Sequence, residues 1–555
     1  MADRFPIIIE STEQQIQELS AGDGLDLTKS GVVNANYVHS AGVNAGVVTA
    51  TSFIGDGSQI TNIPAGGGSL EATASGTLAD GSKVIVNADG TVSVVAQTGS
   101  ASPSVGTPEV FNSSNFGSYY NSAVYDSTNQ KVVIAYSDGG NSYYGTAIVG
   151  EVSGTGITFG TPTVFEYGHS QYISAVHDSS NNKIVIAYRN YDSSSVGKAI
   201  VGEISGNSIS FPSSPGTYES DNTAYNSATY TTGGKVVVAY TDFGDSGKGK
   251  ATVGTVTGTS ISFGSSTTFK TASQSSPIRY IGITYDSTNN KVVIGYRNDS
   301  NSNYGEAIVG EVSGTGISFP SSSVPYKYAD SRYNKLTYDS SNDRVVIAFT
   351  DGGNSYNKAA VVGQVSGTSI SFGTPVIFNS GGYSNYFSAT FDSANGKVVL
   401  TYDDAGNSSY GTAIVGTVSG TSINFGSETV FESANTDYPS ATFDSTNNRV
   451  IIAYTDAGNS SRGTAVVFAV NTLSINLTAE NFIGISNGAY SDGQTATIQI
   501  AGSVDDAQSG LTPGQQYYVQ GDGTLSETAD SPSVLAGTAV AATKLMIGWL
   551  LTWDI

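Results

Sequence analysis

The sequence predicts an all-β protein whose central part, residues 107–477, is a seven-bladed β-propeller. A unit of about 53 residues repeats seven times in this range, and each copy contains four short segments with the pattern of strands. Segments rich in Gly, Asn, Asp and Ser separate these strands, as tight turns require. Four strands per unit of this length is typical of propeller blades, whereas separate sandwich domains would need roughly 100 residues each.

The second strand of each copy is the clearest marker of the repeat. In the first copy it is the segment 131–136, KVVIAY, and its continuous apolar run predicts a strand buried on both faces. The aromatic residue that closes this strand recurs at intervals of 52 to 56 residues. Its seven equivalents are Tyr136, Tyr188, Tyr240, Tyr296, Phe349, Tyr402 and Tyr454.

The first strand of each copy ends at a predicted turn. An Asp begins that turn in six copies, and Thr231 replaces it in the third. The six are Asp126, Asp178, Asp286, Asp339, Asp392 and Asp444. We interpret them as turn residues, because Asp and Asn side chains bond the local backbone and tolerate left-handed geometry.

A closed ring needs a seam where the first and last copies meet. The last copy lacks the usual Phe-Gly-Thr ending and reads LSINL over residues 473–477, while an unmatched strand ending, TPEVF, precedes the first copy at 107–111. We therefore predict that these two segments together complete one blade, so that the ring leaves few exposed strand edges.

The flanks of the propeller divide into three segments. Residues 1–67 are predicted to form an N-terminal fibre-like segment, residues 68–106 a β-hairpin and linker, and residues 478–555 a small C-terminal β module. The hairpin strands are 83–87 and 91–95, joined by the turn 88–90, ADG. Module strands are expected at 495–500, 516–520 and 544–548. Because the seam brings both propeller ends together, we predict that the hairpin pairs with the module.

Composition excludes several classes of partner and site. The net charge of −23 disfavours nucleic acid, which needs a basic surface, and also anionic membranes. With no Cys and three His, disulfides, thiolate metal sites and His-rich metal centres are excluded. We expect no signal peptide, because the N-terminus has no basic region and no apolar run of sufficient length. We also expect no membrane insertion, since no apolar stretch approaches the roughly 20 residues that a spanning helix needs.

Several flanking segments resemble virion structural proteins of tailed phages. They are 53–62 (FIGDGSQITN), 78–90 (LADGSKVIVNADG) and 509–523 (SGLTPGQQYYVQGDG). The similarity is greatest to tail-fibre or appendage proteins of marine, cyanobacterium-infecting phages, and the opening segments 3–9 and 21–27 share it. The resemblance implies a homotrimer whose N-terminus attaches to other virion proteins and whose distal part faces the host. It also implies synthesis in the host cytoplasm and localisation in the virion.

Exposed tyrosines are the candidate ligand-binding residues. Tyr rings stack on the apolar faces of sugars while the hydroxyl forms hydrogen bonds, and propeller loops are common binding surfaces. The candidates are Tyr119, Tyr120, Tyr143, Tyr144, Tyr304, Tyr383, Tyr386 and Tyr410. A packing role between blades is the alternative interpretation for them. Basic departures from the repeat, which could meet anionic glycans or simply face solvent, are Lys248, Lys250, Arg279 and Arg297.

Four Asp-x-Gly-Asn-Ser loops are weak candidates for calcium. Oxygen-bearing side chains in a Gly loop can bind Ca²⁺, but each loop has one carboxylate and lacks an EF-hand spacing, so an Asx-turn is the alternative. The residues concerned are Asp138, Asn141, Asp351, Asn354, Asp404, Asn407, Asp456 and Asn459. No other cofactor is expected.

The sequence thus predicts a non-enzymatic virion fibre or appendage protein whose propeller contacts a host-surface glycan or protein. One alternative is a purely architectural capsid, neck or tail fibre part. The other is a glycan-degrading enzyme, which could work with two carboxylates alone, although the few His exclude most His-based catalytic triads.

Overall fold

The prediction of an all-β protein is confirmed by the computed structural model. The structure describes residues 7–9, 16–18, 68–98, 102–383, 385–471, 474–529 and 532–548. Within these ranges there is no α-helix, and the only helical turns are three short 3-10 segments, η1 (Gly139–Asn141), η2 (Ala405–Asn407) and η3 (Ala457–Asn459). In the N-terminal segment, β1 (Ile7–Ile9) pairs antiparallel with β2 (Ile16–Glu18). The rest of the predicted fibre-like segment 1–67 lies outside the described residues.

Each repeat of the sequence folds into a four-stranded antiparallel unit. In the first unit, β9 (Ser118–Asp126) is innermost, followed by β10 (Lys131–Asp138) and β11 (Tyr144–Ser153). The outer position is shared by β12 (Gly156–Phe159) and the start of β13 (Thr163–Asp178). Val132, Val133 and Ile134 of β10 are fully buried, as the apolar run predicts.

The other six units repeat this order. The second contains the end of β13, β14 (Lys183–Asn190), β15 (Val196–Ser205), β16 (Ser208–Ser210) and β17 (Gly216–Glu219). The third contains β18 (Thr223–Thr231), β19 (Lys235–Asp242), β20 (Lys248–Thr257), β21 (Ser260–Phe263) and β22 (Thr267–Lys270). The fourth contains β23 (Ile278–Asp286), β24 (Lys291–Asn298), β25 (Tyr304–Ser313), β26 (Gly316–Ser318) and the start of β27 (Val324–Asp339). The fifth contains the end of β27, β28 (Arg344–Asp351), β29 (Asn357–Ser366), β30 (Ser369–Phe372) and β31 (Val376–Asn379). The sixth contains β32 (Phe387–Asp392), β33 (Lys397–Asp404), β34 (Tyr410–Ser419), β35 (Ser422–Phe425) and the start of β36 (Thr429–Asp444). The seventh contains the end of β36, β37 (Arg449–Asp456), β38 (Arg462–Ala469), β7 (Ser104–Val105) and β8 (Glu109–Asn112).

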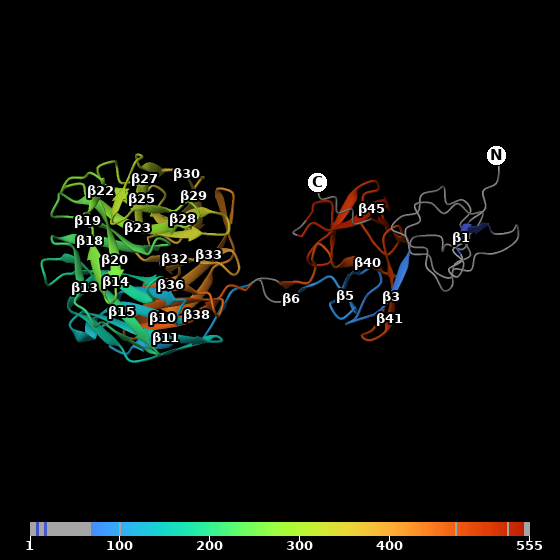
Figure 1. The fold of residues 1–555 in the computed structure, drawn as a ribbon, viewed down its shortest axis with the longest axis horizontal. Coiled ribbons are helices and arrows are strands. Elements are labelled where there is room, and N and C mark those ends of the chain that lie inside the picture. The colour runs from blue at the N-terminus through green and yellow to red at the C-terminus, as the bar shows by residue number, and fades with distance from the viewer. Residues whose placement is uncertain are drawn as a thin grey trace. The chain divides into compact units, whose positions relative to one another are not determined.

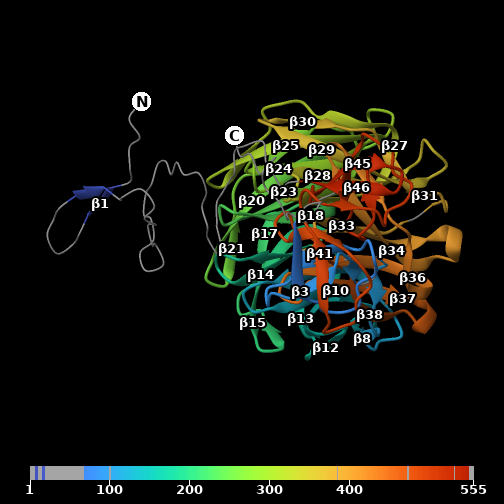
Figure 2. The ribbon, with the colours of Figure 1, turned by 90° about the vertical axis from the view of Figure 1, so that its right-hand side faces the viewer.

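These units close into a ring. The colours in Figure 2 run around it from blue-green β12 through green β20 and yellow β30 to orange β37. Serines on the innermost strands link neighbouring units: the Ser122 hydroxyl accepts from the Ala175 amide at 2.9 Å, and the Ser440 hydroxyl accepts from the Ala123 amide at the same distance. The second bond joins the last unit to the first, which is the arrangement of a β-propeller.

The seam differs from the prediction in one of its two segments. β38 of the last unit pairs with β8 and β7 from before the first unit, so the N-terminal segment closes the ring as expected. In the C-terminal segment predicted at 473–477, the described residues 474–477 do not close the ring. Its β39 (Ser474–Ile475) pairs instead with β6 (Gln97–Thr98), and Leu477 is buried in the core of the flanking module. Ile475 and Leu477 have the apolar character of a blade strand, but they pack in the core of the module.

Aromatic pairs fill the space between successive units. The outer strand of one unit places an aromatic ring against the buried aromatic residue that closes the second strand of the next. Phe111 of β8 packs on Tyr136 of the first unit with ring centroids 5.2 Å apart, and Phe165 packs on Tyr188 at the same distance. The other five pairs are Tyr218–Tyr240, Phe269–Tyr296, Tyr326–Phe349, Phe378–Tyr402 and Phe431–Tyr454, at 5.2 to 5.4 Å.

The flanks on the two sides of the propeller form one module. Its first sheet has the order β3 (Ser69–Thr73), β41 (Thr495–Gln499), β40 (Phe482–Ser486), β4 (Lys83–Val86), β5 (Val92–Val94), so two strands of the C-terminal flank lie between strands of the N-terminal flank, red beside blue in Figure 1. The second sheet has the order β42 (Val504–Asp505), β46 (Lys544–Ile547), β45 (Leu535–Ala541), β43 (Gln516–Val519), β44 (Leu525–Ser526).

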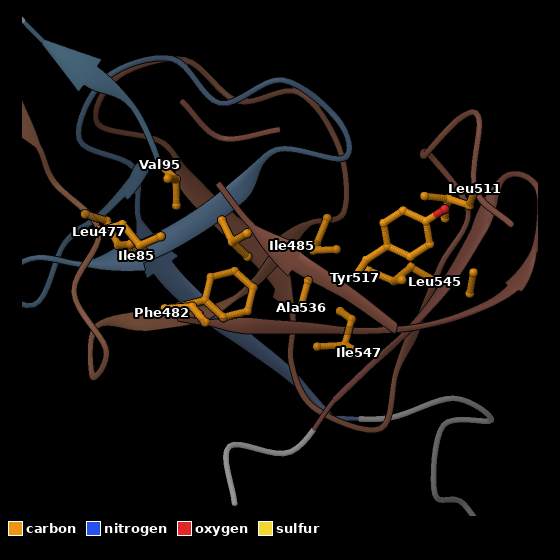
Figure 3. Packing of buried hydrophobic residues seen from close by; sticks show 13 residues of the cluster. Ile85, Val95, Leu477, Phe482, Ile485, Leu511, Tyr517, Ala536, Leu545 and Ile547 are labelled. Atoms are coloured by element: carbon orange, nitrogen blue, oxygen red, sulfur yellow. The ribbon is translucent and has the colours of Figure 1, made fainter. Parts of the chain in front are cut away.

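A shared core joins these two sheets. In Figure 3, Ile85 of the N-terminal flank lies beside Leu477 and Phe482, which follow the propeller in the chain, and all three are buried. The hairpin of residues 83–95 therefore pairs with the C-terminal segment, and the propeller is inserted between the halves of the module.

The two faces of the propeller carry different features. Asp126 accepts hydrogen bonds from the amides of Thr128 and Asn129 at 2.9 Å, which is the turn role predicted for it. This turn lies at the far end of β9 from Ser118, which pairs with Asp138 beside the β10–β11 loop. Because β38 pairs with β7 through Ala469, both chain connections leave the propeller at the Asp126 face. The face with the β10–β11 loops carries neither connection.

We predict that Phe111→Ala lowers the free energy of unfolding of the propeller by about 3–5 kcal/mol, because it removes a buried ring from the strand that closes the circle. Phe111 is 4% exposed. Chemical denaturation followed by circular dichroism measures the change. The matched control is Phe116→Ala, since Phe116 is 71% exposed and should change stability by no more than about 0.5 kcal/mol. Equal midpoints for the two variants would show that closure does not depend on this contact.

Candidate functional site

In six units, an irregularity in the innermost strand directs a tyrosine side chain toward the centre of the propeller. The register between first and second strands shifts in six units, for example between Ala135 and Ser137 of the first unit. In these units the tyrosine at the shift has positive φ, as at Tyr120, where φ is 54°. A left-handed conformation costs a bulky residue about 1–2 kcal/mol. Strain of this kind, repeated at equivalent positions, indicates a constraint imposed by the ring or by function.

The tyrosines form a nearly continuous belt, which we name the tyrosine ring. Its members are Tyr120, Tyr172, Tyr225, Tyr280, Tyr333, Tyr386 and Tyr438. Six pairs of neighbours have centroids 4.2 to 5.3 Å apart, including Tyr120 and Tyr438 across the seam. At the remaining junction, the Tyr333 hydroxyl donates to the side-chain oxygen of Asn385 at 2.9 Å.

The tyrosine ring encloses a cavity of about 310 Å³. This volume is at the lower end of the range for small-ligand sites. Besides the seven tyrosines, the lining contains amide side chains such as Asn121 and Asn226, apolar side chains, and one charged residue, Lys335. No Asp or Glu contributes to the lining within the described part of the chain.

A second aromatic group, the aromatic rim, borders the tyrosine ring at the loop face. It consists of Tyr119, Tyr143, His169 and Tyr191, with successive centroids 5.6, 4.7 and 5.2 Å apart. Tyr119 joins it to Tyr438 at 5.8 Å. Tyr143 and Tyr191 are 40% and 52% exposed, so a ligand at this face can reach their rings.

Burial, and to a smaller extent the charges beside the cavity, set the protonation state of His169 in the aromatic rim. The Arg189 guanidinium lies 5.4 Å from the Tyr191 ring and 5.9 Å from the Tyr172 ring. Burial lowers the pKa of His169; nearby Asp192 opposes this shift and Arg189 adds to it. The His169 imidazole is therefore neutral at neutral pH and presents a flat uncharged ring.

The predicted tyrosines divide into three groups. Tyr120 and Tyr386 line the cavity, and Tyr119 and Tyr143 belong to the aromatic rim. Tyr383 contacts Tyr333 and Tyr356 near the Arg332 guanidinium, on another part of the same face.

The last three tyrosines lie away from the cavity lining. Tyr144 and Tyr304 pack at the outer strands against Tyr167 and Tyr328. Tyr410 lies on β34, where it pairs with Asn435.

The basic residues singled out in the sequence are neutralised by acids. Arg279 and Arg297 share Asp299 at 2.9 and 2.7 Å. Lys248 and Lys250 both contact Asp245, at 2.8 and 2.9 Å. These residues already have carboxylate partners, so the interpretation that they offer free charge to an anionic glycan is not supported.

The four Asp-x-Gly-Asn-Ser loops cap their own backbone. Asp138, Asp351 and Asp404 each accept a hydrogen bond from a Gly amide two residues on, at 3.0 to 3.1 Å, and Asp456 accepts from the Asn459 amide at 3.0 Å. Asn141, Asn407 and Asn459 end the 3-10 turns η1, η2 and η3, and the Asn354 amide donates to the Asp351 carbonyl at 3.0 Å. The described residues contain no group of three His, Cys, Asp or Glu that could hold a metal ion. The loops have the geometry of the Asx-turn alternative.

Sequence reasoning missed the tyrosine ring as a set. The signal was present, because each member stands six residues before the turn residue of its copy, including Tyr225 before Thr231. The period-two alternation of a strand does not show which way these side chains point, since the shift in register changes it.

Comparisons with known proteins show only weak likeness of fold. No protein-family model matches the chain, and no curated protein matches it in sequence. The BP39L lectin of Burkholderia pseudomallei has a TM-score of 0.48 and 11% identity, covering 65% of this chain and 98% of the lectin. A Dyadobacter fermentans protein of unknown function has a TM-score of 0.41 and 13% identity, covering 66% and 99%. A leech intramolecular trans-sialidase has a TM-score of 0.38 and 10% identity, covering 69% and 71%. Similarity this low carries no argument about ligand or activity.

The described residues also contain no helix with the length and apolar character needed to cross a membrane.

We predict that the pKa of His169 lies below its ordinary value near 6.5, and that Asp192→Asn lowers it further by removing the carboxylate that favours the cation. Titration of the imidazole Cε1–H signal by NMR measures both values, and the chain has only three His to assign. A pKa at or above 6.5 in the unmodified protein would contradict the burial of this ring.

Proposed function

We propose that the protein is a non-enzymatic, saccharide-binding appendage of a tailed-phage virion, and that the loop face of its propeller contacts the host surface. The observation that carries this proposal is the joining of the aromatic rim to the tyrosine ring around a cavity. Flat, partly exposed aromatic rings beside hydroxyl and amide groups suit a ligand with apolar faces and many hydroxyls.

The geometry offers a saccharide two kinds of contact. Tyr143, His169 and Tyr191 supply stacking surfaces on the exposed face, and the neutral state of His169 removes the cost of desolvating a cation. Below them, the ring hydroxyls and the side chains of Asn121 and Asn226 line a cavity that can hold the end of a glycan chain. The weak individual contacts of such a site suit repeated attachment to a surface.

Binding is favoured over hydrolysis by the distribution of carboxylates. Glycoside hydrolysis commonly uses two carboxyl groups on opposite sides of the scissile bond. No described carboxylate lines the cavity, although Asp437 and Asp403 both lie near Tyr386 of the tyrosine ring. Burial raises the pKa of Asp437. Neither acid lines the cavity where the sugar would lie, so a glycan-degrading enzyme is the weaker proposal.

The virion role rests on the flanking segments that resemble phage fibre proteins and on the two faces of the propeller. Both chain connections leave at the Asp126 face, so attachment through the flanks and the module leaves the tyrosine-lined face without a covalent connection. A fibre protein that presents a receptor-binding face needs this separation. A purely architectural fibre part is the alternative, and it would use the same face for contacts with other virion proteins.

We predict that Tyr143→Ala and Tyr191→Ala each weaken binding of a recognised glycan at least tenfold, because each removes an exposed stacking surface worth about 0.5–1.5 kcal/mol together with its buried area. Screening on a glycan array, followed by isothermal titration calorimetry, measures the effect. The matched control is Tyr328→Ala, since Tyr328 is 73% exposed but packs on Tyr304 at the outer strands. Equal losses of affinity for all three variants would contradict the assignment of the aromatic rim as the stacking surface.

We also predict that cryo-electron microscopy of virions carrying this chain shows the loop face of the propeller projecting into solvent. A propeller clamped by other virion proteins through that face would overturn host contact and support the architectural alternative. Release of sugar from a bound glycan by the purified protein would instead favour the enzyme.

A further inference from the structure

One cation, Lys335, lines the cavity. It occupies a position of the repeat at which the other units have Ser or Gly. The position two residues after each member of the tyrosine ring is occupied by Ser in five units, by Gly282 in the fourth and by Lys335 in the fifth. The five are Ser122, Ser174, Ser227, Ser388 and Ser440. Four of these serines accept an amide hydrogen bond from the next unit at 2.9 to 3.0 Å. A lysine ammonium has no acceptor lone pair, so Lys335 gives up this structural role.

The Lys335 ammonium has no partner among the described residues. It makes no ion pair or hydrogen bond with them, although its side chain lines the cavity and is accessible from it. The nearby cations of the loop face have partners: Arg279, Arg297 and Arg332 pair with Asp299 or Asp330, and Arg189 donates to the Ser195 hydroxyl at 2.7 Å. In a chain with a net charge of −23, the one charged group of the cavity lining is thus an unpaired cation.

We propose that Lys335 binds the carboxylate of an acidic saccharide whose terminal residue enters the cavity. This inference rests on the proposed saccharide function and names the substrate class for the same site. Desolvation by the surrounding protein lowers the pKa of Lys335, and a carboxylate bound beside the ammonium would favour its charged form. The ring hydroxyls and amides would then hold the neutral hydroxyls of the same sugar.

Position along the strand defines how the ligand would lie. Lys335 is two residues farther along β27 than Tyr333, in the direction away from the loop face. Two residues of a strand span roughly 7 Å, about the length of one sugar ring, so a sugar at the level of the tyrosine ring would direct its carboxylate inward. The aromatic rim would stack on the following residue of the chain.

The test uses the full chain and matched pairs of oligosaccharides that differ only in C6 oxidation, namely glucose and glucuronate, galactose and galacturonate, and mannose and mannuronate at the terminal residue. In any pair that binds, we expect calorimetry to show at least tenfold tighter binding of the acid, as a charge-assisted hydrogen bond supplies. The variant Lys335→Ser, which installs the residue of five other units, should abolish this preference, so that the acid and the neutral sugar bind with affinities within about twofold of each other.

The outcomes separate the two levels of the proposal. If neutral sugars bind as tightly as their acids, or if Lys335→Ser keeps the preference, the role of Lys335 is overturned while saccharide binding stands. If no member of any pair binds, the proposed function fails and the inference fails with it. If acetate or sulfate at equal ionic strength displaces the acidic sugar at millimolar concentration, the site recognises free anions and the saccharide assignment is wrong. Unfolding midpoints of the variant and the unmodified protein serve as the control for folding.

Discussion

The aromatic contact between successive units is the interaction on which the rest of the propeller depends. A four-stranded sheet cannot bury both faces alone, and each unit here covers its neighbour by placing a Phe or Tyr of its outer strand on the aromatic residue that ends the next unit's second strand. The contact repeats seven times, so its distance fixes the spacing of the innermost strands as well. The size of the central cavity follows from this spacing, because the tyrosine ring can meet only when the strands lie at one radius.

The tyrosine ring combines a packing role with the role that we propose for it in binding. Its rings pack on each other, which stabilises the centre of the propeller, yet their left-handed backbone is strained in six units. Packing alone would be served by a regular strand with an apolar residue at that position. The repeated shift in register places a hydroxyl-bearing ring at the cavity, where the saccharide of the proposed function would meet it. The sixth unit differs, because β32 begins only at Phe387, and there the ring has its one interrupted junction.

Much of the architecture could be predicted from the sequence, and the gaps have physical reasons. Periodicity and turn residues located the strands of each unit, the Asp126 turns and the hairpin of the flanks, because these are local patterns. The C-terminal half of the seam was wrong, since an apolar segment such as 474–477 fits any β core and only long-range packing decides which one. The eight candidate tyrosines were chosen because they lie near loops. This criterion does not distinguish the loop face from the outer edge of a unit, where Tyr144 packs on Tyr167. Lys335 escaped notice because its meaning comes from comparison with the serines at equivalent positions and from the cavity around it.

Closure of the ring by β8 has a consequence for the order in which the chain is made. The partner of β8 lies about 350 residues later in the sequence, on β38. During synthesis, β8 and the adjoining face of the first unit therefore remain without their partner strand until almost the whole propeller has left the ribosome. An unpaired strand edge beside exposed aromatic residues is prone to join other chains. Successful production of this protein then depends on how quickly translation delivers the last unit, or on a chaperone that shields the waiting edge.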